Sequence, residues 1–192
     1  MIELIIAGVI VLIVVIIIVA LAAIYNSLVS TKKQVENSWA QIDVQLKRRT
    51  DLIPNLIETV KGYAKFEKKV LTEVTKARTA IMSAKTPKQA AQGENMLSGA
   101  LKTIFAVAES YPALKANENF KSLQEELAST ENKIAFARQF YNDMVMKWNT
   151  MILQFPTNIV ANAFGKNKEI DSFEASASEK KSVKVDFSDL SK

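Results

Sequence analysis

The feature that most constrains this chain is an apolar run near its start. Residues 4–24 carry no charged or polar side chain, and sixteen of these 21 residues are Ile, Val or Leu. A helix of 21 residues is about 31 Å long, close to the roughly 30 Å hydrocarbon core of a bilayer. β-branched residues favour helices poorly in water, but lipid forces the backbone to satisfy its own hydrogen bonds. Residues 1–24 are therefore predicted to be a membrane anchor, with the lipid bilayer as partner of Leu4 to Ile24.

A cleaved signal peptide is the alternative interpretation of this run. Ala20-Leu21-Ala22 fits a small-residue cleavage pattern, but no Lys or Arg precedes the run, and the run is longer than a signal core. Lys32 and Lys33 follow the run closely. Because cytoplasmic flanks carry the excess of basic residues, we expect an uncleaved single-pass anchor, a short N-terminus outside and the remaining domain in the cytoplasm.

Composition excludes several kinds of active site. The chain has no Cys and no His, which removes thiol and imidazole catalysis and the usual zinc ligands. Its net charge is +5, and the basic residues are interspersed with acidic ones. This pattern lacks the basic patch of a nucleic-acid-binding protein, so no nucleic-acid partner is expected.

Apolar residues at seven-residue steps predict long helices with coiled-coil packing. The clearest series is Phe120, Leu127, Ile134, Tyr141, Trp148 and Phe155. Five such heptads indicate a helix of about 36 residues with one buried stripe. Shorter series of the same kind predict three more helices between residues 25 and 110.

Helix boundaries have chemical markers. Thr50 and Asp51 favour the start of a new helix, with Pro54 in its first turn; the alternative is a proline kink in one continuous helix. We expect the break, because an unbroken helix of over 50 residues could not fold back. Thr86-Pro87-Lys88-Gln89 is typical of a capping box, and Asn117 or Asn119 is expected to cap the last long helix.

These boundaries predict an all-α fold. An N-terminal transmembrane helix is followed by an antiparallel up-and-down four-helix bundle with long helices, because short connections place successive helices antiparallel. The bundle domain is expected to span residues 25–162. Residues 163–192 are rich in Ser, Lys and Glu and are expected to form a disordered tail.

Several polar residues fall on or beside the apolar stripes. They are Asp43, Arg48, Arg49, Glu67, Glu131, Arg138, Asn142 and Asn149. A buried charge costs several kcal/mol unless it is paired. We therefore expect a structural polar network in which the arginines, above all Arg138, pair with carboxylates on other helices and set the helix register.

A carboxylate site is the alternative role for three of these residues. Asp43, Glu67 and Glu131 could bind a divalent ion through oxygen ligands, as di-iron bundles do. Those bundles use Glu-x-x-His, and this chain has no His. We therefore expect no metal, no cofactor and no catalytic residue, with a polar small-ligand cavity as a further alternative.

Motifs from just past the apolar run to the last long helix form a specific combination. They are Tyr25-Asn26-Ser27-Leu28-Val29, Trp39-Ala40-Gln41-Ile42-Asp43-Val44-Gln45-Leu46-Lys47-Arg48-Arg49, Asp51-Leu52-Ile53-Pro54-Asn55-Leu56, Val60-Lys61-Gly62-Tyr63, Tyr111-Pro112-Ala113-Leu114-Lys115-Ala116-Asn117, Glu131-Asn132-Lys133-Ile134-Ala135, Tyr141-Asn142, Trp148-Asn149 and Phe155-Pro156. Together they cover nearly the whole chain, and the chain resembles the LemA family of bacterial membrane proteins. The family often has His before the acid that matches Glu67, whereas this chain has Phe66, which weakens any site there.

The resemblance implies a single-pass protein of the bacterial inner (plasma) membrane with a cytoplasmic antiparallel four-helix bundle. It implies no enzymatic activity, and it implies a role in envelope homeostasis. We therefore expect a membrane-anchored, non-enzymatic interaction or scaffold protein that self-assembles as a homo-oligomer. The alternatives are a transmembrane sensor that relays a signal through a continuous anchor helix, and a carboxylate-based enzyme.

Overall fold

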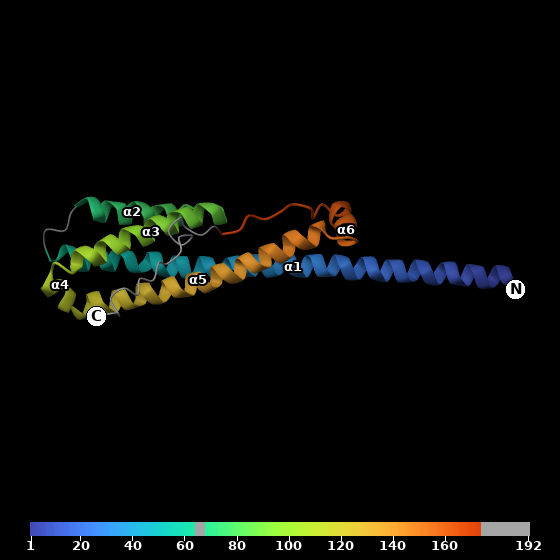
Figure 1. Cartoon of the computed structure of the whole chain (residues 1–192), viewed down its shortest axis with the longest axis horizontal. Helices are drawn as coiled ribbons and strands as arrows, with labels where there is room; N and C mark the ends of the chain where they lie inside the picture. Colours follow the sequence, from blue (N-terminus) through green and yellow to red (C-terminus); the bar gives the residue numbers. More distant parts are fainter. Residues whose placement is uncertain (64–67, 174–192) are drawn as a thin grey trace, which may run out of the picture. The chain divides into compact units, whose positions relative to one another are not determined.

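The computed structural model describes residues 1–63 and 68–173, and every regular element within them is a helix. The helices are α1 (Ile2–Lys61), α2 (Lys68–Met82), α3 (Pro87–Ala108), α4 (Pro112–Ala116), α5 (Glu118–Leu153) and α6 (Thr157–Ala163) (Figure 1). This confirms the all-α prediction for the described residues. The four-helix bundle and its up-and-down topology remain predictions.

The chain divides into two compact units, which are described separately. The first unit contains residues 1–49 and 124–172, and the second contains residues 50–123 and Phe173. Helices α1 and α5 each contribute to both units, since the boundaries fall inside them.

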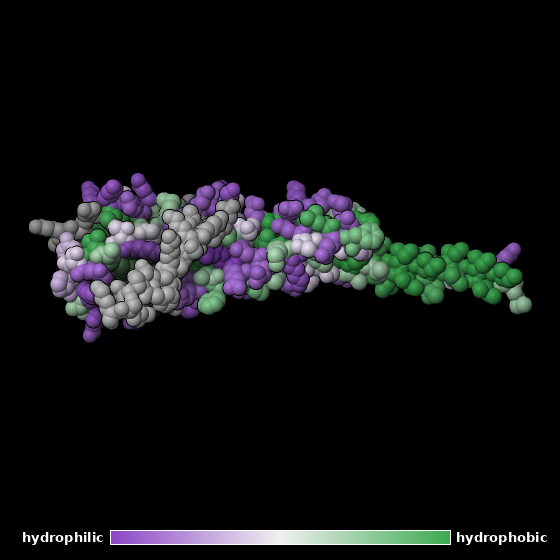
Figure 2. Space-filling view, in the orientation of Figure 1, coloured by the Kyte–Doolittle hydropathy of each residue, from purple (hydrophilic) through white to green (hydrophobic). Residues whose placement is uncertain are grey.

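The apolar run forms the first part of α1. This helix is long and apolar enough to cross a membrane, and none of its most apolar window is buried against other parts of the chain. Figure 2 shows these residues as a hydrophobic rod. Large apolar side chains exposed along several turns would be strongly unfavourable in water, at about 25 cal/mol per Å² of apolar surface. An apolar N-terminal helix is therefore a confirmed feature of the fold.

The predicted helix break at Thr50-Asp51 is wrong, because α1 continues through Pro54 to Lys61. A proline inside a helix has no N–H to donate to the carbonyl four residues earlier, here that of Thr50. The structure supplies another donor: Arg78 Nε on α2 donates to the Thr50 carbonyl at 3.0 Å. The hydrogen bond that Pro54 cannot make is thus replaced from a neighbouring helix, and the helix can continue.

The part of the chain between residues 25 and 110, for which the sequence analysis predicted three helices, is divided at other places. Helix α1 ends at Lys61 and a turn follows at Gly62 and Tyr63, while α2 begins at Lys68. Residues 64–67, including the predicted network residue Glu67, lie outside the described residues.

In the first unit, α5 packs its heptad stripe into the core. Leu127, Ile134, Tyr141 and Trp148 are all buried, as the seven-residue spacing predicts, whereas Phe155 lies past the end of α5 and is exposed. In two of the contacts that join α1 and α5, the residue that comes earlier in α1 contacts the residue that comes later in α5. They are Arg48 with Glu126, and Trp39 with Tyr141, whose ring centroids are 5.7 Å apart.

In the second unit, α2 and α3 form a closely packed pair. Gly93 lies where α3 meets α2, and an added Cβ there would be 2.9 Å from the Ile81 backbone nitrogen. Real Cβ atoms do not approach so closely, so only glycine permits this spacing. The two helices are joined by a short turn at residues 83–86.

Two predicted helix caps are confirmed in this unit. The Thr86 hydroxyl accepts a hydrogen bond from the Gln89 amide at 3.2 Å, with Pro87 at the first helical position. Asn117 Oδ1 accepts one from the Phe120 amide at 3.0 Å, which selects Asn117 over Asn119 as the cap of α5. Each cap satisfies one of the amides that a helix start leaves without a partner.

Two short helices were not predicted. Helix α4 begins at Pro112, and α6 follows Pro156. Proline suits the start of α4 because its fixed φ angle is compatible with the first turn of a helix, whereas Pro156 precedes α6 as its N-cap residue.

Candidate functional site

One of the expected ion pairs lies between α1 and α5 in the first unit. Arg49, which is only 3% exposed, pairs with Glu131, whose side chain is partly open to solvent. Arg48, the residue directly before Arg49, pairs with Glu126 at 3.3 Å, and both of these side chains are about half exposed. A buried guanidinium requires a counter-charge, whereas an exposed pair contributes little. Arg49 and Glu131 are thus two members of the predicted network that the structure brings together as a charged pair.

The other charged members of the predicted network differ from Arg49 in how far their side chains are buried. Asp43 is exposed, so it requires no buried partner, and Arg138 is half-buried. Glu67 lies outside the described residues. Within the residues that the structure describes, no group of three or more His, Cys, Asp or Glu side chains could hold a metal ion. The alternative carboxylate site of Asp43, Glu67 and Glu131 is not tested, because Glu67 is not among the described residues.

Asn149 binds a backbone segment that follows α6. Its Nδ2 donates to the Ile170 carbonyl at 2.9 Å, and its Oδ1 accepts from the Ile170 amide at 2.9 Å. Trp148 Nε1 donates to the Lys168 carbonyl at 3.0 Å. Asn142, half-buried one heptad before Asn149, helps to line a shallow pocket beside the same segment. The sequence analysis identified Asn149 as a polar residue beside the stripe but not its partner.

Tyr141 also contacts this segment. Its hydroxyl donates to the Asp171 carbonyl at 3.0 Å, and the ring is buried. Burial, with a smaller contribution from the Asp171 charge, raises the pKa of Tyr141 to about 12. A phenol that stays protonated keeps its donor role, so the hydrogen bond to Asp171 persists far above neutral pH.

Residues 164–173 form none of the regular elements, yet side chains of α5 hold part of this segment by hydrogen bonds. The predicted disordered tail began at residue 163, and these contacts were not anticipated. Phe173, the last described residue, is 1% exposed. The rest of the predicted tail, residues 174–192, lies outside the described residues.

An apolar groove opens on the surface of the first unit. It has a volume of about 620 Å³ and lies between residues 37–45 of α1 and residues 133–140 of α5. Val44, Phe136 and Phe140 line it, and all three are exposed. Exposed aromatic side chains gathered in one hollow are typical of surfaces that bind a protein partner. The heptad pattern did not reveal this groove, because its residues lie outside the buried stripe.

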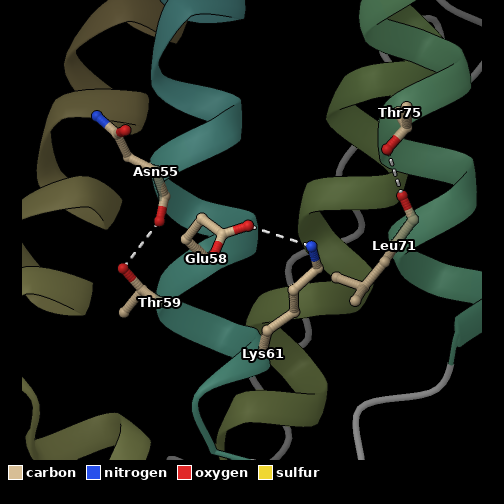
Figure 3. A network of polar contacts seen from close by, with 6 residues as sticks. All are labelled: Asn55, Glu58, Thr59, Lys61, Leu71 and Thr75. Carbon is tan, nitrogen blue, oxygen red and sulfur yellow. Dashed lines mark hydrogen bonds and ion pairs between the residues drawn. The ribbon is translucent and has the colours of Figure 1, made fainter.

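Polar contacts at the end of α1 and along α2 are local (Figure 3). Thr59 and Thr75 donate to the carbonyls four residues earlier in their own helices, at 2.8 and 2.9 Å. Lys61 Nζ pairs with Glu58 at 3.1 Å within the last turns of α1. Such hydrogen bonds and i,i+3 pairs contribute only a few tenths of a kcal/mol to a helix, and they arrange no catalytic group.

A buried carboxylate in the second unit was also missed. Glu94 on α3 is 3% exposed, and the Ser98 hydroxyl one turn later donates to it at 3.2 Å. It lies four residues after Ala90 and three before Leu97, both of which are buried, so the helical spacing could have indicated it.

Comparison with known proteins gives consistent matches. The model described as the LemA family matches residues 38–187. Protein LemA of Metamycoplasma hominis is 27% identical over 172 residues, covering 86% of this chain and 74% of its own length. Magnetosome protein MamQ 2 of Paramagnetospirillum magneticum is 24% identical over 163 residues, covering 71% of this chain. Magnetosome protein MamQ of Magnetospirillum gryphiswaldense is 22% identical over 167 residues.

The chain spans 60% and 61% of the length of these two MamQ relatives. None of these names denotes an enzyme. The family match covers well over half of the chain and includes the ion pair of Arg49 and Glu131 and the segment bound by Asn149. On this match, the chain belongs to the LemA family.

Proposed function

We propose that this chain is a membrane-anchored, non-enzymatic interaction protein. Its N-terminal helix crosses the bacterial inner membrane once, and its helical domain lies at the cytoplasmic face. The observation that carries this proposal is the form of α1, which runs from the fully exposed apolar segment into the packed first unit without a break. A lipid bilayer is the environment that covers such a segment, and Lys32 and Lys33 after it favour the cytoplasmic side for the domain.

The apolar groove lined by Val44, Phe136 and Phe140 is the proposed interaction surface. Two apolar residues from α5 and one from α1 give it the shape and chemistry to receive an amphipathic helix. We propose a second copy of this chain as one occupant, because long amphipathic helices can add protomers side by side. A role in envelope homeostasis would follow from the partners that this surface recruits.

Cysteine crosslinking tests this proposal well, because the chain has no cysteine of its own. In cell membranes, Phe136→Cys in the groove is expected to give crosslinked products that Lys102→Cys, at an exposed position of α3, does not give. A product of twice the chain's mass would identify a second copy. Identical crosslinking of both variants would contradict the assignment of the groove.

Topology and anchoring are tested in the same cells. Lys85→Cys, in the exposed turn between α2 and α3, is expected to resist an impermeant thiol reagent until the cells are opened. Labelling in intact cells would place the domain outside. Release of the chain from membranes by alkaline carbonate would show that α1 is not an anchor.

A relay of membrane signals is a second candidate, and the continuity of α1 through Pro54 favours it. Two glycines inserted after Ile24 would interrupt the helix at the membrane boundary. A scaffold is expected to keep its Phe136→Cys crosslinks after this insertion, because the groove is unchanged. If the protein is a relay, the yield of the Phe136→Cys crosslinks should depend on the lipid composition of the membrane before the insertion and no longer depend on it afterwards.

A further inference from the structure

Exposed apolar side chains gather where α5 ends and around α6. Leu153 is 65% exposed, Phe155 80%, Ile159 58% and Phe164 61%. They lie within a short stretch of the chain, from the last residue of α5 to the residue that follows α6, and none of them is buried. Surface apolar residues scattered singly need no explanation, but a cluster of this size marks a contact with something apolar.

The last member of this cluster, Phe164, lies beside the end of the apolar run. Tyr25 is the first residue after the run, and its ring centroid is 4.8 Å from that of Phe164. Lys166 Nζ lies 5.1 Å from the centroid of the same Tyr25 ring. All of these residues belong to the first unit, so the contacts fix the end of α6 against α1 at the point where α1 leaves its apolar segment.

The composition of the cluster matches the boundary between lipid and water. Aromatic and aliphatic side chains enter the interfacial layer of a bilayer, and nearby lysines extend toward the phosphates. Here Phe155, Ile159 and Phe164 are accompanied by Lys166, and exposed Lys168 follows. In Figure 2 the green surface of the N-terminal helix continues onto green and pale green atoms where the helix enters the rest of the first unit.

The apolar groove of the first unit is a different surface. Phe136 precedes Leu153 by 17 residues on α5, which is about 25 Å along a helix. A lipid surface at the level of Tyr25 would therefore reach the cluster around α6 and not the groove.

We propose that α6 and its flanking residues Phe155 and Phe164 form a second membrane contact, lying in the headgroup region of the bilayer that α1 crosses. This inference rests on the proposed function, because it requires α1 to span that bilayer. The occupant of the cluster is the lipid surface itself. Lys166 is held against Tyr25 by its cation–π contact, and it places a positive charge at the depth of the lipid phosphates.

Fluorescent labelling of single cysteines tests the proposal in the full-length protein. Ile159→Cys, labelled with an environment-sensitive dye, is placed in vesicles of phosphatidylcholine and phosphatidylglycerol that carry a nitroxide near the headgroup or deep in the acyl chain. Phe155→Cys provides a second probe of the same contact. Phe136→Cys, equally apolar and exposed, is the matched control, and Ile13→Cys reports the anchor.

The expected result is a shift of the dye at Ile159 and Phe155 to shorter wavelength, with stronger quenching by the shallow nitroxide than by the deep one. The dye at Phe136 is expected to show no lipid quenching, and the dye at Ile13 is expected to be quenched by the deep nitroxide. Absence of quenching at Ile159 and Phe155 while Ile13 is quenched would overturn the second contact and leave the anchor intact. A shift without lipid quenching would mean that protein covers the cluster, which also overturns it. Absence of quenching at Ile13 would instead overturn the proposed function.

Discussion

The close approach of α2 and α3 makes a sharp prediction about two glycines of the same helix. A Cβ at Gly93 would lie 2.9 Å from the Ile81 nitrogen, 3.0 Å from Ile81 Cγ1 and 3.1 Å from the Ala80 carbonyl carbon. A Cβ at Gly99 would meet no atom within 4 Å. Gly93→Ala and Gly99→Ala therefore introduce the same methyl group on α3, against backbone in one case and into open space in the other.

The magnitudes follow from two opposing effects. Replacing glycine by alanine inside a helix stabilises it by about 1 kcal/mol, because the unfolded chain loses conformational freedom. At Gly99 this is the only effect, so Gly99→Ala is expected to raise the free energy of unfolding by about 0.5–1 kcal/mol. At Gly93 two of the three contacts involve the α2 backbone, which must shift, and overpacking of this kind costs about 1–3 kcal/mol. Because the helix-propensity gain is common to both variants, their difference, about 1–3 kcal/mol, isolates the steric cost.

The assay is denaturant unfolding of the full-length protein in mild detergent, followed by the helical circular dichroism signal. The midpoint of Gly99→Ala is expected to lie above that of the natural sequence, and the midpoint of Gly93→Ala below that of Gly99→Ala. Equal midpoints, or a more stable Gly93→Ala, would show that α2 and α3 are not packed at the spacing described.

Three further predictions concern single side chains. Glu131→Gln is expected to destabilise the protein by about 1.5–3 kcal/mol because it removes the counter-charge of a buried guanidinium, while Glu126→Gln, at an exposed pair, costs less than about 1 kcal/mol in the same unfolding assay. Arg78→Met is expected to lower the free energy of unfolding by about 1–3 kcal/mol, because it removes the donor that replaces the missing Pro54 amide. In a Pro54→Ala background, where a backbone amide returns, the cost of Arg78→Met should be smaller. Equal costs in both backgrounds would show that Arg78 does not replace the missing amide. The raised pKa of Tyr141 predicts that stability depends on pH, because between pH 10 and about 12 the unfolded state loses the phenol proton while the folded state keeps it. The free energy of unfolding should therefore fall as pH rises through this window, by at most about 2–3 kcal/mol. Tyr141→Phe should abolish this part of the loss when unfolding is measured across the same pH range.

Features with a local cause were predicted well from the sequence. The heptad series placed Leu127, Ile134, Tyr141 and Trp148 in the core because the same spacing repeats over five heptads and leaves no other face to bury. The Thr86 cap was recognisable because the residues that form it are adjacent in sequence.

Features that depend on distant residues were not predictable in the same way. Whether a helix continues through Pro54 is decided by Arg78, 28 residues from the carbonyl that it satisfies. The segment after α6 has a polar composition typical of disorder, but Asn149, Trp148 and Tyr141 bind its backbone. Composition reports on the segment alone and carries no information about side chains elsewhere that are available to pair with it.

The way in which α5 holds the segment of residues 168–171 has an evolutionary consequence. All of the hydrogen bonds described from Tyr141, Trp148 and Asn149 end on main-chain carbonyl or amide groups of that segment. Main-chain groups are the same whatever amino acid carries them, proline apart, so substitutions at Lys168 or Asp171 should be tolerated freely. Selection should instead act on the side chains of α5 that make these hydrogen bonds, which are those of Tyr141, Trp148 and Asn149. Among related chains, we expect Tyr141, Trp148 and Asn149 to be conserved while the residues at positions 168–171 vary.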